Sequence, residues 1–297
     1  QMCGLLEEAE WRCTRAEGGC GVRIGRTSRG TEVVLDEWVA KAEAVLVVNT
    51  VEPHYFAGFT GGRKSILPGS SAKKTILQNH YLACLPGSRP AVLEGNPVHE
   101  DMAEAAEMVT ERVPVLHASG VVQGEGLVQF CVGGLAEAFG RSVEVSRKAS
   151  CIALDRRRRL VVARQGRPLD MNLYQAMKAV YNCEDAVSEG GMLVLDADCP
   201  EGLGADHMAA SMEAVLDPLW KTPTRGGYAL GDHSTARLRQ MRRRIRLGLR
   251  STLPEELAAR MGFDVIRSVR DAAEAAGDAL IIEEAGFSVP VLSGASL

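Results

Sequence analysis

The chain alternates short apolar runs with segments of helical periodicity, and this alternation limits the folds that it can adopt. Ala44–Thr50 is rich in β-branched residues and is typical of a strand buried on both faces of a parallel sheet. Leu160–Ala163 and Met192–Asp196 are comparable runs, and the helical pattern of Asn172–Ala186 lies between them. Strands that alternate with helices of about 10–15 residues predict an α/β fold with parallel-type sheets.

The length of the chain, 297 residues, is enough for two α/β domains, because domains usually hold about 100–200 residues. A glycine-containing stretch at 133–140 suggests a boundary that divides the chain into residues 1–141 and 142–297, with a cleft between them. The chain begins at Gln1 rather than at a methionine, and its first recognisable element corresponds to half of a domain. We therefore expect a fragment of a longer protein.

Composition narrows the functional classes. The net charge of −4 and the pI of about 5.9 argue against sequence-independent binding of nucleic acid, and the arginine runs 156–159 and 242–246 are predicted to be solvated faces. No apolar run reaches the roughly 18 residues of a membrane span. The eight cysteines form no CxxC pair, which indicates reduced thiols. We expect a cytoplasmic protein that binds neither nucleic acid nor a membrane.

Many of the residues that could bind a ligand or transfer a proton lie between His54 and Gly69, just after the predicted strand 44–50. In open α/β sheets this is where ligands bind. Four consecutive residues there offer backbone donors and positive charge: Gly61, Gly62, Arg63 and Lys64. The segment is not a Walker A motif, because an arginine separates the glycine from the lysine. We predict a phosphate-contacting loop; the alternative is a glycine-rich surface turn with solvated charges.

The histidines alone do not define a metal site. His80 lies on the predicted helix 71–85, for which Ser70 or Ser71 is the expected N-cap, and it shares one face with Ile76 and Cys84. That position is more typical of a core histidine than of a ligand. The remaining histidines after His54 have no partners at metal-ligand spacing: His99, His117, His207 and His233.

Gln175 and Lys178 lie at i and i+3 near the start of the predicted helix 172–186. An amide and an ammonium group side by side at a helix start could hold a carboxylate substrate. The alternative is an ordinary solvent-facing surface of the helix.

Several longer stretches form a joint pattern: Gly25–Thr31, His54–Lys64, Ile66–Gly69, Asn79-His80, Gly95–Met102 and Asp170–Lys178. Together they resemble the nickel-dependent lactate racemase family, over about Ile24 to Gly204. The resemblance implies the family's cofactor, the nickel-pincer nucleotide (a Ni(II) pyridinium-3,5-bisthiocarboxylic acid mononucleotide). It also implies a 2-hydroxy acid as substrate and cofactor-synthesis enzymes as partners.

By this resemblance, Lys64 is the lysine that bonds covalently to the cofactor, His80 completes the coordination of nickel, and His54 is a catalytic acid/base. Gly61, Gly62 and Arg63 then belong to the cofactor-binding loop of the N-terminal domain, of which residues 1–141 are the C-terminal part. In the second domain, 142–297, three residues resemble those that face the substrate: Tyr174, Gln175 and Lys178. Lys178 also counts among the catalytic residues, because its charge would offset that of the substrate carboxylate.

The implied activity is racemisation or epimerisation of 2-hydroxy acids by proton-coupled hydride transfer. The chain departs from the family in two places. The family's second catalytic histidine and a cofactor-contacting Asp/Arg loop would lie upstream of Gln1, which suggests a truncated chain or a partner that supplies the missing half. Arg156–Arg159 and the single Gly166 replace an apolar strand and a Gly-Gly pair, which puts the identity of the substrate in doubt.

Two alternatives stay open. The chain could be a non-catalytic or incomplete fragment that holds the cofactor without turning over substrate. It could also be a dehydrogenase-like α/β enzyme that uses NAD, although no GxGxxG follows a first strand.

Overall fold

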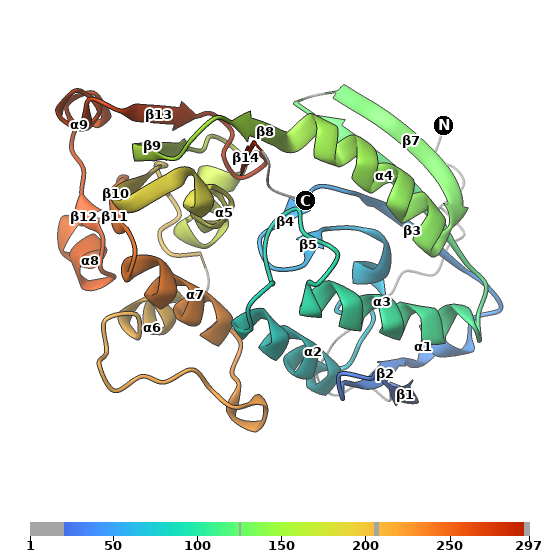
Figure 1. Ribbon diagram of the computed structural model, residues 1–297. Helices are drawn as coiled ribbons and strands as arrows, with labels where there is room; N and C mark the ends of the chain where they lie inside the picture. Colours follow the sequence, from blue (N-terminus) through green and yellow to red (C-terminus); the bar gives the residue numbers. More distant parts are fainter. Residues whose placement is uncertain (1–20, 125, 205–207, 294–297) are drawn as a thin grey trace.

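A computed structural model describes residues 21–124, 126–204 and 208–293 (Figure 1). The elements up to α4 gather on one side of the molecule, and those from β9 onward gather on the other. The strands of the first group are β1 (Gly21–Arg26), β2 (Glu32–Asp36), β3 (Val45–Thr50), β4 (Pro53–His54), β5 (Gly58–Phe59), β6 (Val115–Gln123) and β7 (Gly126–Gly134). Its helices are α1 (Glu37–Lys41), the 3-10 turn η2 (Gly62–Ser65), α2 (Lys73–His80), η3 (Tyr81–Cys84), α3 (Pro97–Thr110) and α4 (Leu135–Ser150).

The first sheet has the order β3-β6-β7. β3 and β6 run parallel, as the sequence predicts, whereas β7 runs antiparallel to β6 after a tight connection. The sheet is therefore mixed. α4 covers one of its faces through Phe139 and Val143, which pack with Val51 and Phe59 at the end of β3 and in β5.

The other face of the first sheet is apolar and exposed. The register pairs Leu46 with Leu116 across β3 and β6, and it pairs Gly120 with Phe130 across β6 and β7. Alternate residues of these strands share one face, because side chains of a strand point to opposite sides in turn. The exposed apolar side chains of this face are Leu46, Val48, Leu116, Val128, Phe130 and Val132.

The second group contains a five-stranded sheet in the order β12-β11-β10-β9-β13, in which all strands are parallel. Its strands are β9 (Arg158–Arg164), β10 (Val187–Asp196), β11 (Arg246–Arg250), β12 (Asp264–Val265) and β13 (Ala279–Ile282). Its α-helices are α5 (Leu173–Cys183), α6 (Met208–Glu213), α7 (Asp232–Arg242), α8 (Glu255–Arg260) and α9 (Val269–Ala276). Short 3-10 turns lie at η4 (Leu169–Met171), η5 (Glu184–Ala186) and η6 (Arg225–Gly227).

Both faces of this second sheet are covered. Val161, Leu193 and Leu195 point into the large core shared with α5, α6 and α7. Val162 and Val194 point the other way, toward α9. Burial on both faces explains why these strands are continuous apolar runs in the sequence.

The junction between the two groups is closed by a third pair of strands, β8 (Cys151–Leu154) and β14 (Val289–Leu292), which run parallel. The boundary expected after residue 141 falls inside α4, which continues to Ser150. The division into two domains stays a prediction. A division after residue 150 would leave α4 whole against the first sheet.

The N-terminal end of α2 differs from the prediction. Ser70 and Ser71 do not cap this helix, because their hydroxyls donate instead to the carbonyls of Ser65 and Ile66. The helix begins at Lys73 with no side-chain cap. α3, by contrast, has a side-chain cap, since Asn96 accepts hydrogen bonds from N–H groups of the first turn.

No helix within the described ranges is long and apolar enough to cross a membrane. The cysteines in those ranges are free thiols: Cys84, Cys131, Cys151, Cys183 and Cys199. Cys3, Cys13, Cys20 and His207 lie outside the described residues.

Candidate functional site

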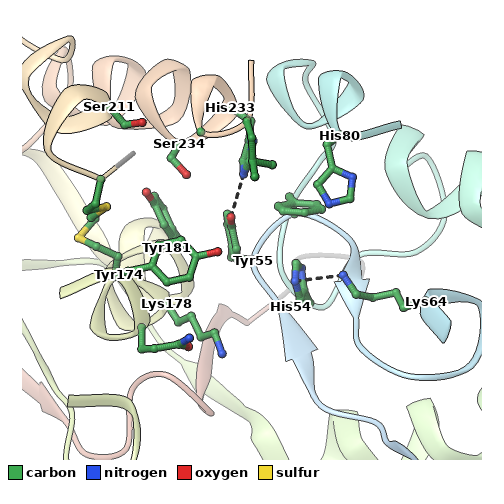
Figure 2. Close-up of a pocket in the computed structure, with 16 residues that line it drawn as sticks. His54, Tyr55, Lys64, His80, Tyr174, Lys178, Tyr181, Ser211, His233 and Ser234 are labelled. Carbon is green, nitrogen blue, oxygen red and sulfur yellow. Dashed lines mark hydrogen bonds between the residues drawn. The ribbon is translucent and has the colours of Figure 1, made fainter. Parts of the chain in front are cut away.

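A cavity of about 280 Å³ lies between the two groups of elements (Figure 2). Its first wall carries His54, Lys64 and His80, which come from β4, η2 and the last residue of α2. Its second wall is formed by residues of α5, α6 and α7 together with the loop before α7. The predicted substrate-facing residues lie on this second wall: Tyr174, Gln175 and Lys178. The fold therefore brings into one cavity two sets of residues that are far apart in the sequence.

The first wall is shaped by a short hairpin and a glycine-rich turn. β4 and β5 pair antiparallel, with His54 opposite Gly58. Gly61 and Gly62 have φ values of +78° and +51°, and a Cβ at Gly62 would lie 2.9 Å from Phe139. Only glycine adopts such a backbone at little cost. The turn thereby returns the chain so that Lys64 faces His54.

Gly61, Gly62 and Arg63 do not line the cavity in the part of the chain that the structure describes. The buried guanidinium of Arg63 donates to the carbonyls of Ala57 and Phe59 and lies 4.3 Å from the centre of the Phe139 ring. These hydrogen bonds of Arg63 stabilise the loop from behind, and its role in binding the cofactor stays a prediction. The glycines are required for tight packing of the turn rather than for close approach to the cavity.

The hydrogen bonds of His54 bear on which side chain donates in the contact between His54 and Lys64. His54 Nδ1 accepts a hydrogen bond from the backbone N–H of Ala57, at 3.3 Å. A neutral imidazole then carries its proton on Nε2, which lies 3.2 Å from Lys64 Nζ. Nε2–H can donate to Nζ only if that nitrogen has a free lone pair. This tautomer of His54 pairs with a Lys64 that is a neutral amine.

The electrostatics of the first wall agree with this assignment. Desolvation, together with the positive charges of Arg63 and Lys178, lowers the pKa of Lys64 to about 7. Desolvation lowers the pKa of His54 well below its usual value, and the charge of Lys64 acts in the same direction. The pKa of His80 is also lowered well below its usual value, first by desolvation and then by His233. Near neutral pH this wall presents uncharged imidazoles and a partly uncharged amine.

The second wall presents one face of α5. Asn172 caps this helix by accepting from the N–H of Gln175, and Lys178 follows on the same face. A small pocket beside the main cavity brings Glu52 to the same neighbourhood as Lys178. Burial raises the pKa of Glu52, and the charge of Lys178 opposes this rise. The charge of Lys178 therefore stabilises a carboxylate in this part of the cavity wall.

Sequence reasoning missed several residues of the cavity: Tyr55, Tyr181, Ser211, His233 and Ser234. His233 had been set aside because it has no partner at ligand spacing. In the fold, its Nε2 lies 2.9 Å from the Tyr55 hydroxyl and its Nδ1 lies 2.6 Å from that of Tyr228. No local sequence signal marks it, because Tyr55 and His233 are brought together only by the packing of α7 on the β4 hairpin.

Arg237, one turn after His233 on α7, joins the two walls. Its guanidinium donates to the carbonyl of Tyr55 on one side and to that of Tyr181 on the other. It also forms an ion pair with Glu184 at 3.0 Å, and both side chains are largely buried. A buried, multiply bonded arginine fixes geometry more strongly than a surface ion pair does.

The comparisons with known proteins agree with the residues gathered here. The profile of the lactate racemase N-terminal domain matches residues 11–90, and that of the lactate racemase C-terminal domain matches residues 157–223. The lactate racemases of Thermoanaerobacterium thermosaccharolyticum and Lactiplantibacillus plantarum are each 29% identical to the chain, over 197 and 199 residues. The resemblance of the chain to the lactate racemase family, which its motifs predict, is thereby confirmed.

The chain spans about half the length of the curated lactate racemases that it matches: each match covers 66% of the chain and 46% of the relative. The lactate racemase apoprotein of T. thermosaccharolyticum has the same fold, with a TM-score of 0.85 and 24% identity over 97% of this chain and 72% of that chain. A crystal structure from Thermotoga maritima matches with a TM-score of 0.69 and 16% identity, over 89% of this chain and 70% of that chain. The predicted α/β class with parallel sheets is confirmed.

Three of the stretches that resemble lactate racemases meet behind His80. The buried carboxylate of Asp101 accepts hydrogen bonds from the hydroxyls of Thr27 and Thr31 and from the side-chain amide of Asn79. These residues belong to the separate motifs Gly25–Thr31, Asn79-His80 and Gly95–Met102. Because Asn79 directly precedes His80, the network fixes the end of α2 that presents this histidine to the cavity.

The protein side chains do not form a complete metal site. Among the described residues there is no group of three or more His, Cys, Asp or Glu that could hold a metal ion. A metal in this lactate racemase-like cavity would need most of its ligands from a non-protein group. His80 could supply one more, because burial lowers its pKa and keeps the imidazole neutral.

Proposed function

We propose that this protein racemises or epimerises 2-hydroxy acids, as lactate racemases do, with a nickel-pincer nucleotide attached to Lys64. The observation that carries the proposal is the meeting of His54, Lys64 and His80 with Lys178 across one cavity. In this proposal residues 1–141 belong to the cofactor-binding domain and residues 142–297 to the substrate-facing domain.

The residues of the first wall fit such a cofactor. Covalent attachment requires a nucleophilic amine, and a lysine whose pKa is lowered to about 7 is largely neutral at slightly alkaline pH. His80 offers a neutral imidazole to a metal whose other ligands come from the cofactor. When bound, the cofactor would supply a carbon that takes up and returns the hydrogen of substrate carbon 2 as a hydride.

The residues of the second wall fit a 2-hydroxy acid. Lys178 would bind the carboxylate through a charge-assisted hydrogen bond, and Gln175 and Tyr174 lie on the same helix to orient it. Binding at Lys178 would place the hydroxyl of the substrate toward the first wall. The position of Lys178 across the cavity from His54 supports this orientation.

His54 would exchange a proton with the substrate hydroxyl. Its lowered pKa keeps the imidazole neutral at pH 7, as a general base requires. In the free protein its Nε2–H is engaged by the lone pair of Lys64. Formation of a thioamide would leave the lysine nitrogen without a lone pair to accept from Nε2–H, so that His54 could take up the other tautomer and present the Nε2 lone pair to the hydroxyl proton of the substrate. Attachment of the cofactor and activation of His54 are thus coupled.

The proposal includes a cellular setting. We infer a cytoplasmic enzyme that receives its cofactor from cofactor-synthesis enzymes and that acts on a small molecule rather than on nucleic acid or a membrane. The free thiols of the described cysteines and the acidic pI support this inference.

The experiment is to produce the chain together with the cofactor-synthesis enzymes and to measure its intact mass, followed by peptide mapping. We expect an added mass on the peptide that contains Lys64. Lys64→Arg keeps a long nitrogen-bearing side chain, but its permanently charged guanidinium cannot form the thioamide, and the variant should show no added mass. Interconversion of L- and D-lactate is then followed by chiral chromatography.

Two outcomes separate the proposal from its alternatives. An unmodified Lys64, under conditions in which the T. thermosaccharolyticum lactate racemase is loaded in parallel, would contradict the cofactor. A loaded Lys64 without interconversion of any 2-hydroxy acid would favour a chain that only holds the cofactor.

A further inference from the structure

A second cavity, of about 200 Å³, lies outside the site described above, and we call it the junction cavity. On one side its wall is the loop between η3 and α3 of the first group, with Arg89, Pro90 and Val92. On the other side the wall comes from the end of α5, from η5, from the turn between β8 and β9, and from β14. Its volume lies below the roughly 300–1,000 Å³ of pockets for drug-sized ligands, so it suits a small metabolite.

The apolar part of this wall is held in place by its packing. β14 pairs in parallel with β8, and its buried Val289 packs with Val51 and Phe59 in the core of the first group. β14 also contacts α5 and η5 of the second group. The apolar side chains that line the junction cavity are Pro90, Val92, Val289, Pro290, Val291 and Leu292. A preformed apolar surface of this kind suits an aliphatic chain.

Arg157 gives the wall of the junction cavity a cation that no acid neutralises. Its Nε donates to the backbone carbonyl of Asp185, at 3.0 Å, rather than to the carboxylate. In the described part of the chain, Arg157 forms no ion pair. Its terminal nitrogens can therefore donate to a carboxylate in the two-pronged geometry for which a guanidinium is suited.

Two oxygen atoms of the same wall have capacity to accept hydrogen bonds. Asn182 is 3% exposed and donates through Nδ2 to the carbonyls of Ala285 and Gly286. Its Oδ1 has no hydrogen-bond partner among the described residues. Oδ1 of Asp185 lies 3.9 Å from Nη2 of Arg244, which is beyond hydrogen-bond distance. Buried polar atoms normally have partners, so an unpartnered acceptor indicates a place for a donor.

We propose that the junction cavity binds a free α-amino acid with an aliphatic side chain. The carboxylate of the ligand would accept from Arg157, and its ammonium group would donate to Oδ1 of Asn182 and Oδ1 of Asp185. Its side chain would lie against β14. Because the ligand would contact both groups of elements, it would stabilise the arrangement in which they form the main cavity.

The test is calorimetric titration of the cofactor-free chain with L-leucine. Three analogues each lack one part of it: 4-methylpentanoate lacks the ammonium group, 3-methylbutylamine lacks the carboxylate, and glycine lacks the side chain. We expect saturable binding of leucine and at least about tenfold weaker binding of each analogue, as for the loss of one charged hydrogen bond or of a buried aliphatic group. If leucine does not bind, or if 4-methylpentanoate binds as tightly, the inference is overturned.

Three variants locate the binding of leucine. Arg157→Gln removes the cation of the junction cavity and should weaken binding by at least about tenfold. Arg159→Gln is the matched control, because Arg159 is exposed on β9 and does not line this cavity. Lys178→Met removes a cation of the main cavity and should leave leucine binding unchanged. If Lys178→Met abolishes binding and Arg157→Gln retains it, leucine binds in the main cavity and the inference is wrong.

Hydrogen exchange read by mass spectrometry tests whether the ligand contacts both groups of elements. Saturating leucine should slow amide exchange in peptides that cover residues 89–93 and residues 288–292, and Arg157→Gln should remove this protection. Protection confined to the start of α5 would contradict the assignment to the junction cavity. These measurements use the cofactor-free chain, so their outcome does not depend on the proposed function.

Discussion

The two walls of the cavity are built from different kinds of backbone. The first wall consists of a two-residue strand, a glycine turn and the last residue of a helix, and it presents nitrogen atoms with lowered pKa values. The second wall consists of helix faces, and it presents hydroxyl groups and Lys178. A tight turn can bring a histidine and a lysine into contact, whereas helices space their side chains along a surface.

This difference suggests a division of labour. Close contact between His54 and Lys64 tunes their protonation, which suits bond-making steps. Spaced groups on α5, α6 and α7 can instead contact successive parts of a ligand, which suits binding and selection. Variants on the first wall should therefore act on kcat, and variants on the second wall should act on KM.

The largest expected effect comes from the first wall. His54→Gln removes the proton acceptor but retains a polar side chain of similar length. We expect kcat for lactate racemisation to fall by roughly 10²–10⁴-fold, as general acid–base catalysis is worth that much. The mass of the Lys64 adduct should be unchanged, and intact-mass measurement checks this. A large rise of KM with little change of kcat would contradict the proposed division of labour between the two walls.

The next effect comes from the second wall. Lys178→Met retains the aliphatic stem and removes the charge that would bind the carboxylate. We expect KM to rise by roughly 10- to 100-fold, the value of a hydrogen bond to a charged group. Steady-state kinetics with lactate measure the effect. Equal KM values for the variant and the native chain would show that the carboxylate binds elsewhere.

A smaller effect tests whether the first wall depends on the network behind it. Asp101→Asn replaces a buried carboxylate that accepts three hydrogen bonds by an amide with only one acceptor oxygen. We expect the free energy of unfolding in urea to fall by about 1–3 kcal/mol. Glu43→Gln, at an exposed position, is the matched control. If both variants lose the same free energy of unfolding, the hydrogen-bond network of Asp101 does not stabilise the fold.

The smallest effect is a shift in reactivity. Desolvation lowers the pKa of Lys64 to about 7, so this amine should be mostly protonated below pH 7 and mostly neutral above it. Labelling of the cofactor-free protein with an acylating reagent, read by peptide mass spectrometry, should reach half of its maximum for Lys64 near pH 7. Lys64→Arg is the matched control, because it removes this amine and should abolish the labelling at that position.

The sequence predicts the first wall better than the second because of chain distance. His54, Lys64 and His80 lie within one short stretch, so a motif can carry their joint identity. Gln175 and Lys178 were recognisable from a second motif on one helix. Their meeting with the first wall depends on Arg237 and on the packing of α7, which no local pattern encodes.

The strands that were predicted correctly are those whose burial gives the sequence a local apolar pattern. The strands of the second sheet are apolar throughout because helices cover both of their faces. The hydrogen bonds of Arg63 to backbone carbonyls were not predictable from its neighbours in the sequence. They depend on the β4–β5 hairpin, which places the carbonyls of Ala57 and Phe59 within reach of the guanidinium.

The exposed face of the first sheet has a consequence for the behaviour of the protein in solution. None of its six apolar side chains lines the cavity, and none carries charge. The net charge of −4 makes copies of this protein repel one another in every orientation. The apolar face favours contact between copies only in the orientations that cover it. Because salt screens the repulsion and strengthens the burial of apolar surface, colloidal attraction between molecules will be directional and will increase with ionic strength.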